Sequence, residues 1–307
     1  MISIIIVNYN TAAILRDCLF SLYANLKRSD FEVIVADNFS SDGSVEMIKS
    51  EFPDVRIVAN RENFGFAKAN NQAIPFAKGE YIFLLNPDTF VLDGNIAMLA
   101  DFMGSHPEAG ACGPRVLNSD RTMQRQCKRG GPTFKNLFFY YSGLWRLFPG
   151  SPKWKKIAGG YFLLDKSDDA VCEVDQLSGA AMLIRKAAMG NVGPIEEKYV
   201  MYWEDTDYCF RLKAAGWKIY YVPGASIVHL GGAGGTQRHA GKNLWYFHRG
   251  AAMFYGRYLS DREPLAGRAL FYAGNWAVFF MKFTANLLLK EKIIGSRKPA
   301  KPQSSKK

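Results

Sequence analysis

The stretch "EYIFLLNPDTF" at residues 80–90 combines an apolar run with a carboxylate directly beyond it. Five apolar residues in succession are typical of a strand that is buried on both faces of a sheet. Pro87 has no backbone N–H for a sheet ladder, so we expect the strand to end before it. The stretch therefore predicts that Asp88 lies at the carboxyl end of a buried strand.

The chain on the N-terminal side of this stretch alternates between strand and helix patterns. Leucines at helical spacing predict a helix over 11–26, and further helices are expected after "SSDGS" and over 65–79. Strands are predicted at 3–8, 31–38, 55–60 and 80–86. Such alternation is typical of an α/β fold with a Rossmann-like, mostly parallel sheet flanked by helices.

Each of these four strands ends in polar residues. A single Asn or Asp at such a place is usually a turn residue or a helix cap. Ligands of open parallel sheets, however, bind beyond the carboxyl ends of the strands. Four polar ends along one edge therefore favour a polar site, whose candidate residues are Asn8-Tyr9-Asn10, Asp37-Asn38, Asn60 with Asn63, and Asn86 with Asp88.

The composition describes a folded protein with an excess of positive charge. Of 307 residues, 48% are hydrophobic, and 39 Lys and Arg against 28 Asp and Glu give a formal charge of +11. The excess indicates an anionic partner, which could be nucleic acid, anionic lipid or a phosphorylated substrate, although solubility alone is the other explanation. Five cysteines without CxxC spacing argue against zinc or a disulfide framework and favour a reducing compartment.

No segment resembles a signal peptide, and none reaches the roughly 18 apolar residues of a membrane-spanning helix. The longest apolar candidate, which starts at Ala269, is interrupted by Asn275 and Lys282. Helices are expected over 243–259 and 264–290. The second of these has basic ends and many aromatic residues, which suits either an interfacial helix or packing against the rest of the chain.

Residues 121–160 depart from the alternating pattern, with four Arg, five Lys, no acidic residue and many aromatic side chains. No nucleic-acid-binding motif accompanies them, so we do not expect a nucleic-acid partner. The open alternatives are a solvated basic face over core aromatics, and contact with an anionic membrane surface or a lipid diphosphate. The expected divisions of the chain are 1–120, an excursion over 121–172, a return to the first domain over 173–235, helices within 236–295, and a disordered basic tail at 296–307.

Two carboxylates carry the expected chemistry. Asp88, with Asn86 nearby, offers oxygen ligands of the kind that Mg²⁺ or Mn²⁺ prefers, although an Asp after Pro is often only a helix cap. His229 contributes only if the fold brings it beside Asp88. The segment 203–216 predicts a helix that ends at Gly216 and carries Asp205 on its apolar stripe. Such a carboxylate either complements the helix dipole or acts as a base in a cleft, and the spacing leaves both open.

Six motifs follow one another within residues 2–232, and they are "SIIIVNYN", "VADNFSSDGS", "ENFGFAKANN", "LLNPDT", "VDQLSGAAMLIRK" and "MYWEDTDYCFRLKAAGWKIYYVPGASIVH". In this order they resemble glycosyltransferase family 2, and most closely its bacterial rhamnosyltransferase branch. The resemblance implies a GT-A fold, a nucleotide-sugar donor, a divalent metal and inversion at the anomeric carbon.

The resemblance also implies roles for individual residues, with Asp205 as the general base and Asp88 and His229 as metal ligands. Many family members carry Asp-X-Asp where this chain has Asn86-Pro87-Asp88, and the closest branch shows the same Asn-Pro-Asp. The nucleotide base is expected at Val7, Tyr9 and Asp37, the rest of the donor along Asn63, Gly65, Asn70 and Asn86, and the acceptor near Gly179, Trp203 and Glu204.

We therefore expect a metal-dependent transferase that moves rhamnose from dTDP-rhamnose to a lipid-linked saccharide in cell-wall or surface polysaccharide synthesis. The expected place is the cytoplasmic face of a bacterial plasma membrane, with peripheral attachment. The alternatives are transfer of galactose, glucose or N-acetylglucosamine from a UDP-sugar, a sugar-1-phosphate nucleotidyltransferase, and a non-catalytic nucleotide- or polyanion-binding protein.

Overall fold

The computed structural model describes residues 1–27, 30–92, 95–232 and 240–295. The basic tail expected at 296–307 lies outside the described residues. The chain divides into two compact units, of which the first spans Met1–Arg238 and the second His239–Lys307.

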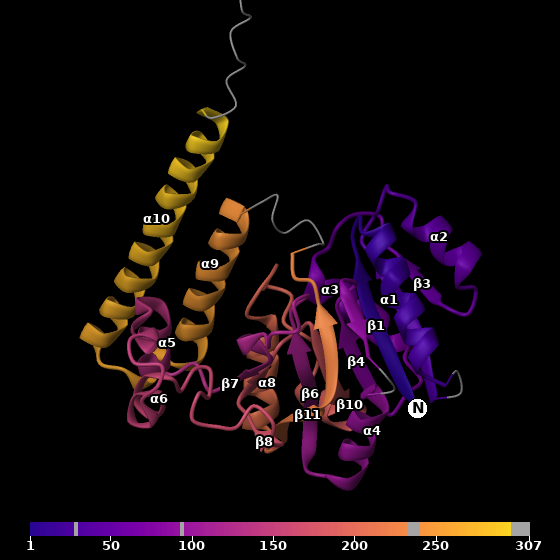
Figure 1. The fold of residues 1–307 in the computed structure, drawn as a ribbon, viewed down its shortest axis with the longest axis horizontal. Coiled ribbons are helices and arrows are strands. Elements are labelled where there is room, and N and C mark those ends of the chain that lie inside the picture. The colour runs from indigo at the N-terminus through magenta and orange to yellow at the C-terminus, as the bar shows by residue number, and fades with distance from the viewer. Residues whose placement is uncertain (28–29, 93–94, 233–239, 296–307) are drawn as a thin grey trace, which may run out of the picture. The chain divides into compact units, whose positions relative to one another are not determined.

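A mixed sheet forms the centre of the first unit (Figure 1). The strands β3, β2, β1 and β4 run parallel, as expected from the sequence. Strand β10 then enters antiparallel to both β4 and β6, so the sheet as a whole is mixed rather than mostly parallel. The strand order is β3 (Arg56–Ala59), β2 (Phe31–Asp37), β1 (Ile2–Asn8), β4 (Tyr81–Leu85), β10 (Ala181–Arg185), β6 (Ala109–Leu117), β11 (Lys218–His229) and β5 (Thr89–Val91), with β8 (Cys172–Glu173) paired to β11.

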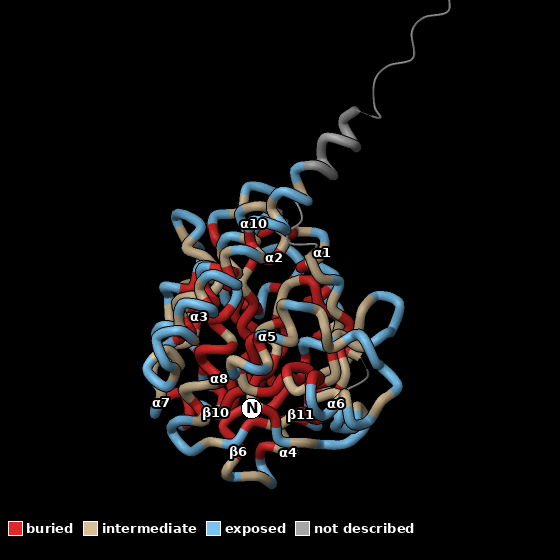
Figure 2. The backbone as a smooth tube through the Cα atoms, turned by 90° about the vertical axis from the view of Figure 1, so that its left-hand side faces the viewer, coloured by how far each residue is buried: buried red, intermediate tan, exposed pale blue. Residues whose placement is uncertain are grey.

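The central strands form because their side chains are apolar on both faces. All five residues of β4 are buried, and β1 carries three consecutive buried isoleucines, whose branched side chains favour extended backbone. Figure 2 shows the same pattern, with buried backbone inside and exposed helix surfaces outside. The flanking helices are α1 (Ala12–Asn25), α2 (Ser44–Glu51), α3 (Phe66–Ala73) with the 3₁₀ turn Ile74–Phe76, α4 (Asn95–Ser105), α7 (Lys186–Val192) and α8 (Glu204–Ala214).

Strand β4 ends at Leu85, as the position of Pro87 predicts. The sequence did not predict strand β5, because its three residues are too few to give a pattern. Strand β5 pairs antiparallel with the end of β11, which places His229 opposite Thr89. The Asn86-Pro87-Asp88 turn is thereby brought beside His229.

The basic aromatic segment contains short elements and a two-stranded sheet. Strand β7 (Lys128–Arg129) pairs antiparallel with β9 (Gln176–Leu177), which ties the segment back to the first unit. Edge-to-face and tilted rings pack in the remainder, for example Phe139 on Trp154 and Trp145 on Phe162. The other elements are the 3₁₀ turns Arg125–Cys127 and Leu144–Arg146 and the helices α5 (Phe134–Ser142) and α6 (Pro152–Ala158).

The second unit contains α9 (Ala240–Tyr258), a 3₁₀ turn (Ser260–Arg262) and α10 (Leu265–Gly295), close to the two expected helices. The ring of Tyr255 on α9 stacks on Phe271 of α10, with ring centroids 3.7 Å apart. Asn275, which interrupts the apolar stretch, is buried and accepts a 2.8 Å hydrogen bond from His248 through its Oδ1. No helix in the described part of the chain is both long and apolar enough to span a bilayer.

Candidate active site

The turn after β4 and the end of β11 bring Asn86, Asp88 and His229 together. His229 Nε2 lies 3.1 Å from Asp88 Oδ1 and 3.2 Å from Asn86 Nδ2. The side chains of Asp88 and His229 are only 6% and 14% exposed, so their polar atoms have few alternative partners in solvent. From the sequence, His229 was expected to contribute only if the fold placed it beside Asp88, and the fold does so.

Gln124 fixes the ring of His229 from the other side. Its Nε2 donates a 2.8 Å hydrogen bond to the backbone oxygen of His229, so its Oε1 is left to face the ring Nδ1 at 3.0 Å. Because Oε1 can only accept, Nδ1 carries the proton. In the neutral ring, the lone pair of Nε2 then points toward Asp88 and Asn86.

This arrangement fits part of a divalent metal site. His229 Nε2 and a carboxylate oxygen of Asp88 face each other at 3.1 Å, and with the neutral ring both are acceptors that a shared cation would contact. Within the described ranges, no group of three or more His, Cys, Asp or Glu side chains could hold a metal ion. Asp88 and His229 would therefore need further oxygen ligands, such as those of a diphosphate.

The polar strand ends form the connected edge that the sequence predicts. Asn8 Nδ2 donates to Asp37 Oδ1 at 2.7 Å, and Asn60 Nδ2 donates to Asn38 Oδ1 at 2.9 Å. Asn38 Nδ2 in turn donates to the backbone oxygen of Gly65 at 3.1 Å. These bonds hold the carboxyl ends of β1, β2 and β3 in one network.

The residues expected at the nucleotide differ in their exposure. Tyr9 is 44% exposed, whereas Asp37 is buried and already accepts a second hydrogen bond from the backbone of Ser40. Asn63 Oδ1 accepts from the N–H of Gly65, which has a φ of +81° at the start of α3. Asn70 is buried and donates to the backbone of its own helix, while its Oδ1 has no partner. The roles of Val7 and of these residues in nucleotide binding stay predictions.

Asp205, in the first turn of α8, is held by hydrogen bonds to both carboxylate oxygens. Its Oδ2 accepts from Arg129 Nη2 at 2.7 Å and from the N–H of Gly179 at 3.1 Å, and its Oδ1 accepts from the N–H of Thr206 at 2.7 Å. Although burial disfavours the charged guanidinium, the Asp205 carboxylate raises the pKa of Arg129 above its usual value. The carboxylate is therefore fixed in orientation.

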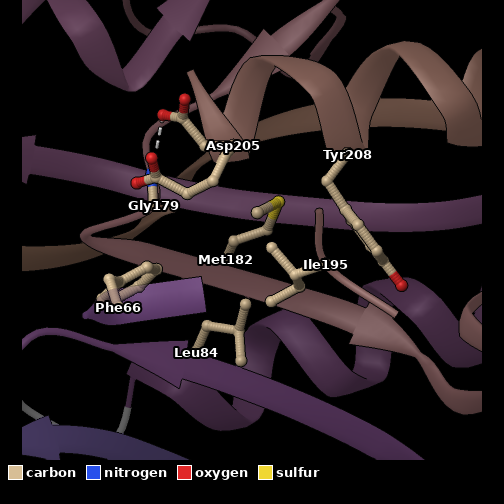
Figure 3. A pocket seen from close by; sticks show the side chains of 8 residues that line it. Phe66, Leu84, Gly179, Met182, Ile195, Asp205 and Tyr208 are labelled. Atoms are coloured by element: carbon tan, nitrogen blue, oxygen red, sulfur yellow. Dashed lines mark hydrogen bonds between the residues drawn. The ribbon is translucent and has the colours of Figure 1, made fainter. Parts of the chain in front are cut away.

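Asp205 lines a narrow pocket of about 10 Å³, which has room for one small polar group. Figure 3 shows Asp205 bonded to Gly179 above apolar side chains from several elements. The pocket is lined by Phe66, Leu84, Gly179, Met182, Ile195, Glu204, Asp205 and Tyr208.

Glu204 lines the same pocket, although by helical geometry it should lie well round the helix from Asp205. It is only 9% exposed, and its Oε2 has no hydrogen-bond partner. Burial, and after it the charge of Asp205, raise the pKa of Glu204 to about 8. The pocket therefore holds a carboxyl group that favours the protonated form, that of Glu204, beside the fixed carboxyl group of Asp205.

The backbone before α8 is unusual. Tyr202 and Trp203 both have positive φ, 66° and 71°, a conformation that costs a bulky residue free energy and that recurs at functional sites. This turn lets Glu204 and Asp205 start the helix inside the pocket. Trp203 itself is buried, so its expected place beside an acceptor stays a prediction.

One peptide links the two carboxylate sites. Gly179 donates its N–H to Asp205, and the next residue, Ala180, accepts a 3.0 Å hydrogen bond from the N–H of Asn86. Strand β10 then begins opposite Leu85, so both sites lie at the same end of β4 and β10. Asp88 and Asp205 therefore both lie at this end of the sheet.

The sequence did not identify Arg129 or Gln124 as site residues. Arg129 lies within the basic segment, and its contact with Asp205 depends on the pairing of β7 with β9, two residues each. Gln124 carries no local motif. Its role depends on a contact between the segment that follows β6 and the end of β11, which no short-range pattern predicts.

Comparisons with known proteins indicate which proteins this chain is similar to. The family model "Glycosyl transferase family 2" matches residues 3–152. An N-acetylglucosaminyl-diphospho-decaprenol L-rhamnosyltransferase of Mycobacterium tuberculosis is 28% identical over 276 residues, which is 86% of this chain and 85% of that protein. Rhamnosyltransferase WbbL of Escherichia coli K12 is 25% identical over 75% of this chain and 83% of its own.

Solved structures show the same fold. The mannosyltransferase PcManGT of Pyrobaculum calidifontis, solved with GDP-Man and Mn²⁺, superposes with a TM-score of 0.56 at 16% identity, over 97% of this chain and 81% of its own. S. aureus TarS 1–349 gives a TM-score of 0.54 at 14% identity, over 91% and 72%. The fold is of the GT-A type, and the protein is a glycosyltransferase that resembles family 2 and, within it, the bacterial rhamnosyltransferases.

Proposed function

We propose that this glycosyltransferase moves rhamnose from dTDP-rhamnose to a hydroxyl of a lipid-linked saccharide, with inversion, in cell-wall or surface polysaccharide synthesis. The similarity to two rhamnosyltransferases supports the sugar, and the diphospho-decaprenol in the name of one of them supports a lipid-linked acceptor. The proposed place is the inner face of a bacterial plasma membrane, where a chain of charge +11 is attracted to anionic lipid.

The observation that carries the proposal is the fixed carboxylate of Asp205 at the same sheet edge as Asp88 and His229. The backbone from Gly179 to Ala180 joins these groups through two hydrogen bonds. A transferase needs a proton acceptor near the attacking hydroxyl and a cationic site near the departing diphosphate. This edge of the sheet supplies side chains for both.

Asp88 and His229 would hold Mg²⁺ or Mn²⁺ together with oxygens of the donor diphosphate. When bound, the cation would offset the negative charge that builds up on the leaving nucleoside diphosphate. The presence of Mn²⁺ in the related PcManGT structure supports this choice of cofactor. Gln124 contributes by keeping the proton on His229 Nδ1, which leaves Nε2 free to act as a ligand.

Asp205 acts on the acceptor. Its carboxylate takes the proton from the acceptor hydroxyl as the hydroxyl oxygen attacks the face of the donor sugar opposite the diphosphate. A single displacement of this kind inverts the anomeric carbon. Arg129 and the N–H of Gly179 hold the carboxylate in one orientation, so little rearrangement precedes proton transfer.

Release of dTDP from dTDP-rhamnose in the presence of a lipid-linked N-acetylglucosamine acceptor tests the proposal. We expect Asp205→Asn to lower kcat about 10²- to 10⁴-fold because it removes the general base. Asp101→Asn, which changes an exposed aspartate on α4, should leave kcat unchanged. Turnover by Asp205→Asn at the normal rate would contradict the assigned base, and turnover with UDP-sugars alone would replace rhamnose as the donor sugar.

A further inference from the structure

A second and larger cavity lies in the basic aromatic segment of the first unit. Its volume is about 290 Å³, close to the lower end of the roughly 300–1,000 Å³ range of small-molecule pockets. None of the residues assigned to donor, metal or acceptor lines it. Its lining residues are Arg125, Trp145, Arg146, Pro149, Lys155, Leu164, Lys166 and Asp168.

The charge of the lining favours a polyanionic ligand. Four cationic side chains face a single carboxylate, that of Asp168, which leaves three positive charges in excess. Asp168 is already paired, with Arg125 Nη1 and Lys128 Nζ each 2.8 Å from its carboxylate. Burial alone would raise the pKa of Asp168, but the hydrogen bond and charge of Lys128 and the charge of Arg125 lower it.

The remaining cations are uncompensated by protein acids. Among the residues that the structure describes, Arg146, Lys155 and Lys166 form no ion pair. Lys166 donates to the backbone oxygen of Glu173, and the guanidinium of Arg146 lies 4.9 Å from the ring centroid of Trp145. Guanidinium and ammonium groups grouped in this way are suited to phosphate oxygens.

Exposed apolar side chains adjoin the lining residues in the sequence. Leu147 and Phe148 lie between the lining residues Arg146 and Pro149 and are 57% and 58% exposed. The walls of the cavity itself include Trp145 and Leu164. A free inorganic anion has no apolar part for these side chains to contact, whereas an anionic group attached to a hydrocarbon chain has one.

Strand β7 connects this cavity with Asp205. Successive side chains of a strand point to opposite faces. Lys128 reaches Asp168 in the cavity wall, while Arg129, the next residue, reaches Asp205. The cavity wall and the candidate base are therefore joined through one dipeptide, with Lys128 on the side of the cavity and Arg129 on the side of Asp205.

We propose that this cavity binds the diphosphate of an isoprenoid-linked acceptor, with the hydrocarbon chain leaving past Leu147 and Phe148. The inference rests on the proposed function for the identity of the acceptor, but the binding site is defined by this chain's own residues. Arg125, Arg146, Lys155 and Lys166 contact the diphosphate oxygens, and Trp145 packs against the first isoprene unit.

Calorimetric titration of the full chain with farnesyl diphosphate, without donor or metal, tests the site directly. The double variant Arg146→Gln/Lys155→Gln removes two charges from the cavity, and we expect its Kd to rise at least tenfold. The double variant Lys153→Gln/Lys156→Gln removes the same charge from exposed positions of α6 outside the lining, and its Kd should stay within twofold. An equal loss in both variants, or in neither, would overturn the proposal.

Competing ligands identify the chemistry that is recognised. Inorganic pyrophosphate should bind at least tenfold more weakly than farnesyl diphosphate, and dTDP should not displace farnesyl diphosphate. Equal affinity for pyrophosphate would remove the isoprenoid from the proposal, and displacement by dTDP would move the ligand to the donor site. The cavity would be assigned to lipid headgroups instead if phosphatidylglycerol vesicles displaced farnesyl diphosphate from the unaltered chain but not from the Arg146→Gln/Lys155→Gln variant, called the cavity variant below.

Kinetics separate a failure of this inference from a failure of the proposed function. With a lipid-linked acceptor, the cavity variant should show a raised KM, while its kcat with an alkyl N-acetylglucosaminide, which lacks a diphosphate, stays unchanged. An unchanged KM in an active enzyme overturns the inference alone. Absence of transfer by the unaltered chain would overturn the proposed function, while the farnesyl diphosphate titration still decides the binding site.

Discussion

Gln124 decides which nitrogen of His229 faces Asp88, because its amide contacts both the ring and the backbone of that histidine. Without it the ring can rotate or carry its proton on Nε2, and either change removes a metal ligand. We expect Gln124→Ala to weaken Mn²⁺ binding in the presence of dTDP about 10- to 100-fold, the usual range for such outer residues. Electron paramagnetic resonance of the free Mn²⁺ measures this change.

Gln126→Ala serves as the matched control, since Gln126 is exposed and lies two residues further along the same segment. Its Mn²⁺ affinity should equal that of the unaltered chain. If Gln124→Ala also binds Mn²⁺ normally, the orientation of His229 does not matter for the metal.

Glu204 makes the stability of the fold depend on pH. Its pKa rises from an ordinary 4.5 to about 8 in the folded state, so between these values the folded chain binds one more proton than the unfolded chain. The contribution of Glu204 to the unfolding free energy is therefore fully present below about pH 4.5 and is lost as the pH rises toward 8. From pH 5 to pH 8 this residue should account for about 2–4 kcal/mol of lost unfolding free energy.

Urea unfolding of Glu204→Gln at the two pH values isolates this contribution, because the amide does not titrate. The variant should lose less stability than the unaltered chain over the same interval. Glu46→Gln, at an exposed position of α2, should keep the full dependence. A Glu204→Gln profile parallel to that of the unaltered chain would mean that Glu204 is ionised in the fold.

The residues that could be predicted from the sequence are those placed by local structure. Asp88 follows a strand whose end is set by Pro87, and Asp205 lies in a helix whose C-terminal glycine, Gly216, has the expected positive φ of 88°. Arg129 and Gln124 act through pairs of segments that are distant in sequence. Sequence periodicity does not predict contacts between distant segments, so the roles of these two residues can be recognised only in the folded structure.

At the scale of elements, the two-stranded sheet of β7 and β9 carries Arg129 to Asp205, and the residue after β7 lies close to the backbone of Gly160. A Cβ on Gly130, directly after β7, would lie 2.2 Å from the backbone oxygen of Gly160. Backbone cannot move aside as a flexible side chain can. We expect Gly130→Ala to lower the unfolding free energy by about 1–3 kcal/mol and to lower activity by displacing Arg129.

Chemical denaturation with turnover measured in parallel checks this prediction. Gly150→Ala is the control, since a Cβ there would have no heavy atom within 4 Å. It should match the unaltered chain in both measurements. Normal stability of Gly130→Ala would show that the backbones at Gly130 and Gly160 can move apart, and that their contact does not constrain Arg129.

The first four strands were predictable because apolar runs alternate with helical patterns, which specify parallel crossovers. Strand β10 was not, since it comes after the long basic segment and its pattern holds no information on direction. Strand β5 has three residues and forms only because β11 lies beside it. The sequence thus predicts the N-terminal half of the sheet, from β1 to β4, better than the half near Asp205.

At the scale of the whole molecule, the charge of +11 and an exposed apolar stripe on α10 both suit an anionic bilayer surface. Leu270, Phe280 and Met281 of the stripe are 60–62% exposed. We expect Leu270→Glu to raise the Kd for phosphatidylglycerol vesicles, measured by co-sedimentation, about tenfold. The variant loses about 1.4 kcal/mol of binding free energy from apolar burial and charge attraction. Val171→Glu changes the net charge equally at a 50% exposed site of the first unit and should bind nearly normally. Equal binding by all three chains would mean that α10 does not contact the bilayer.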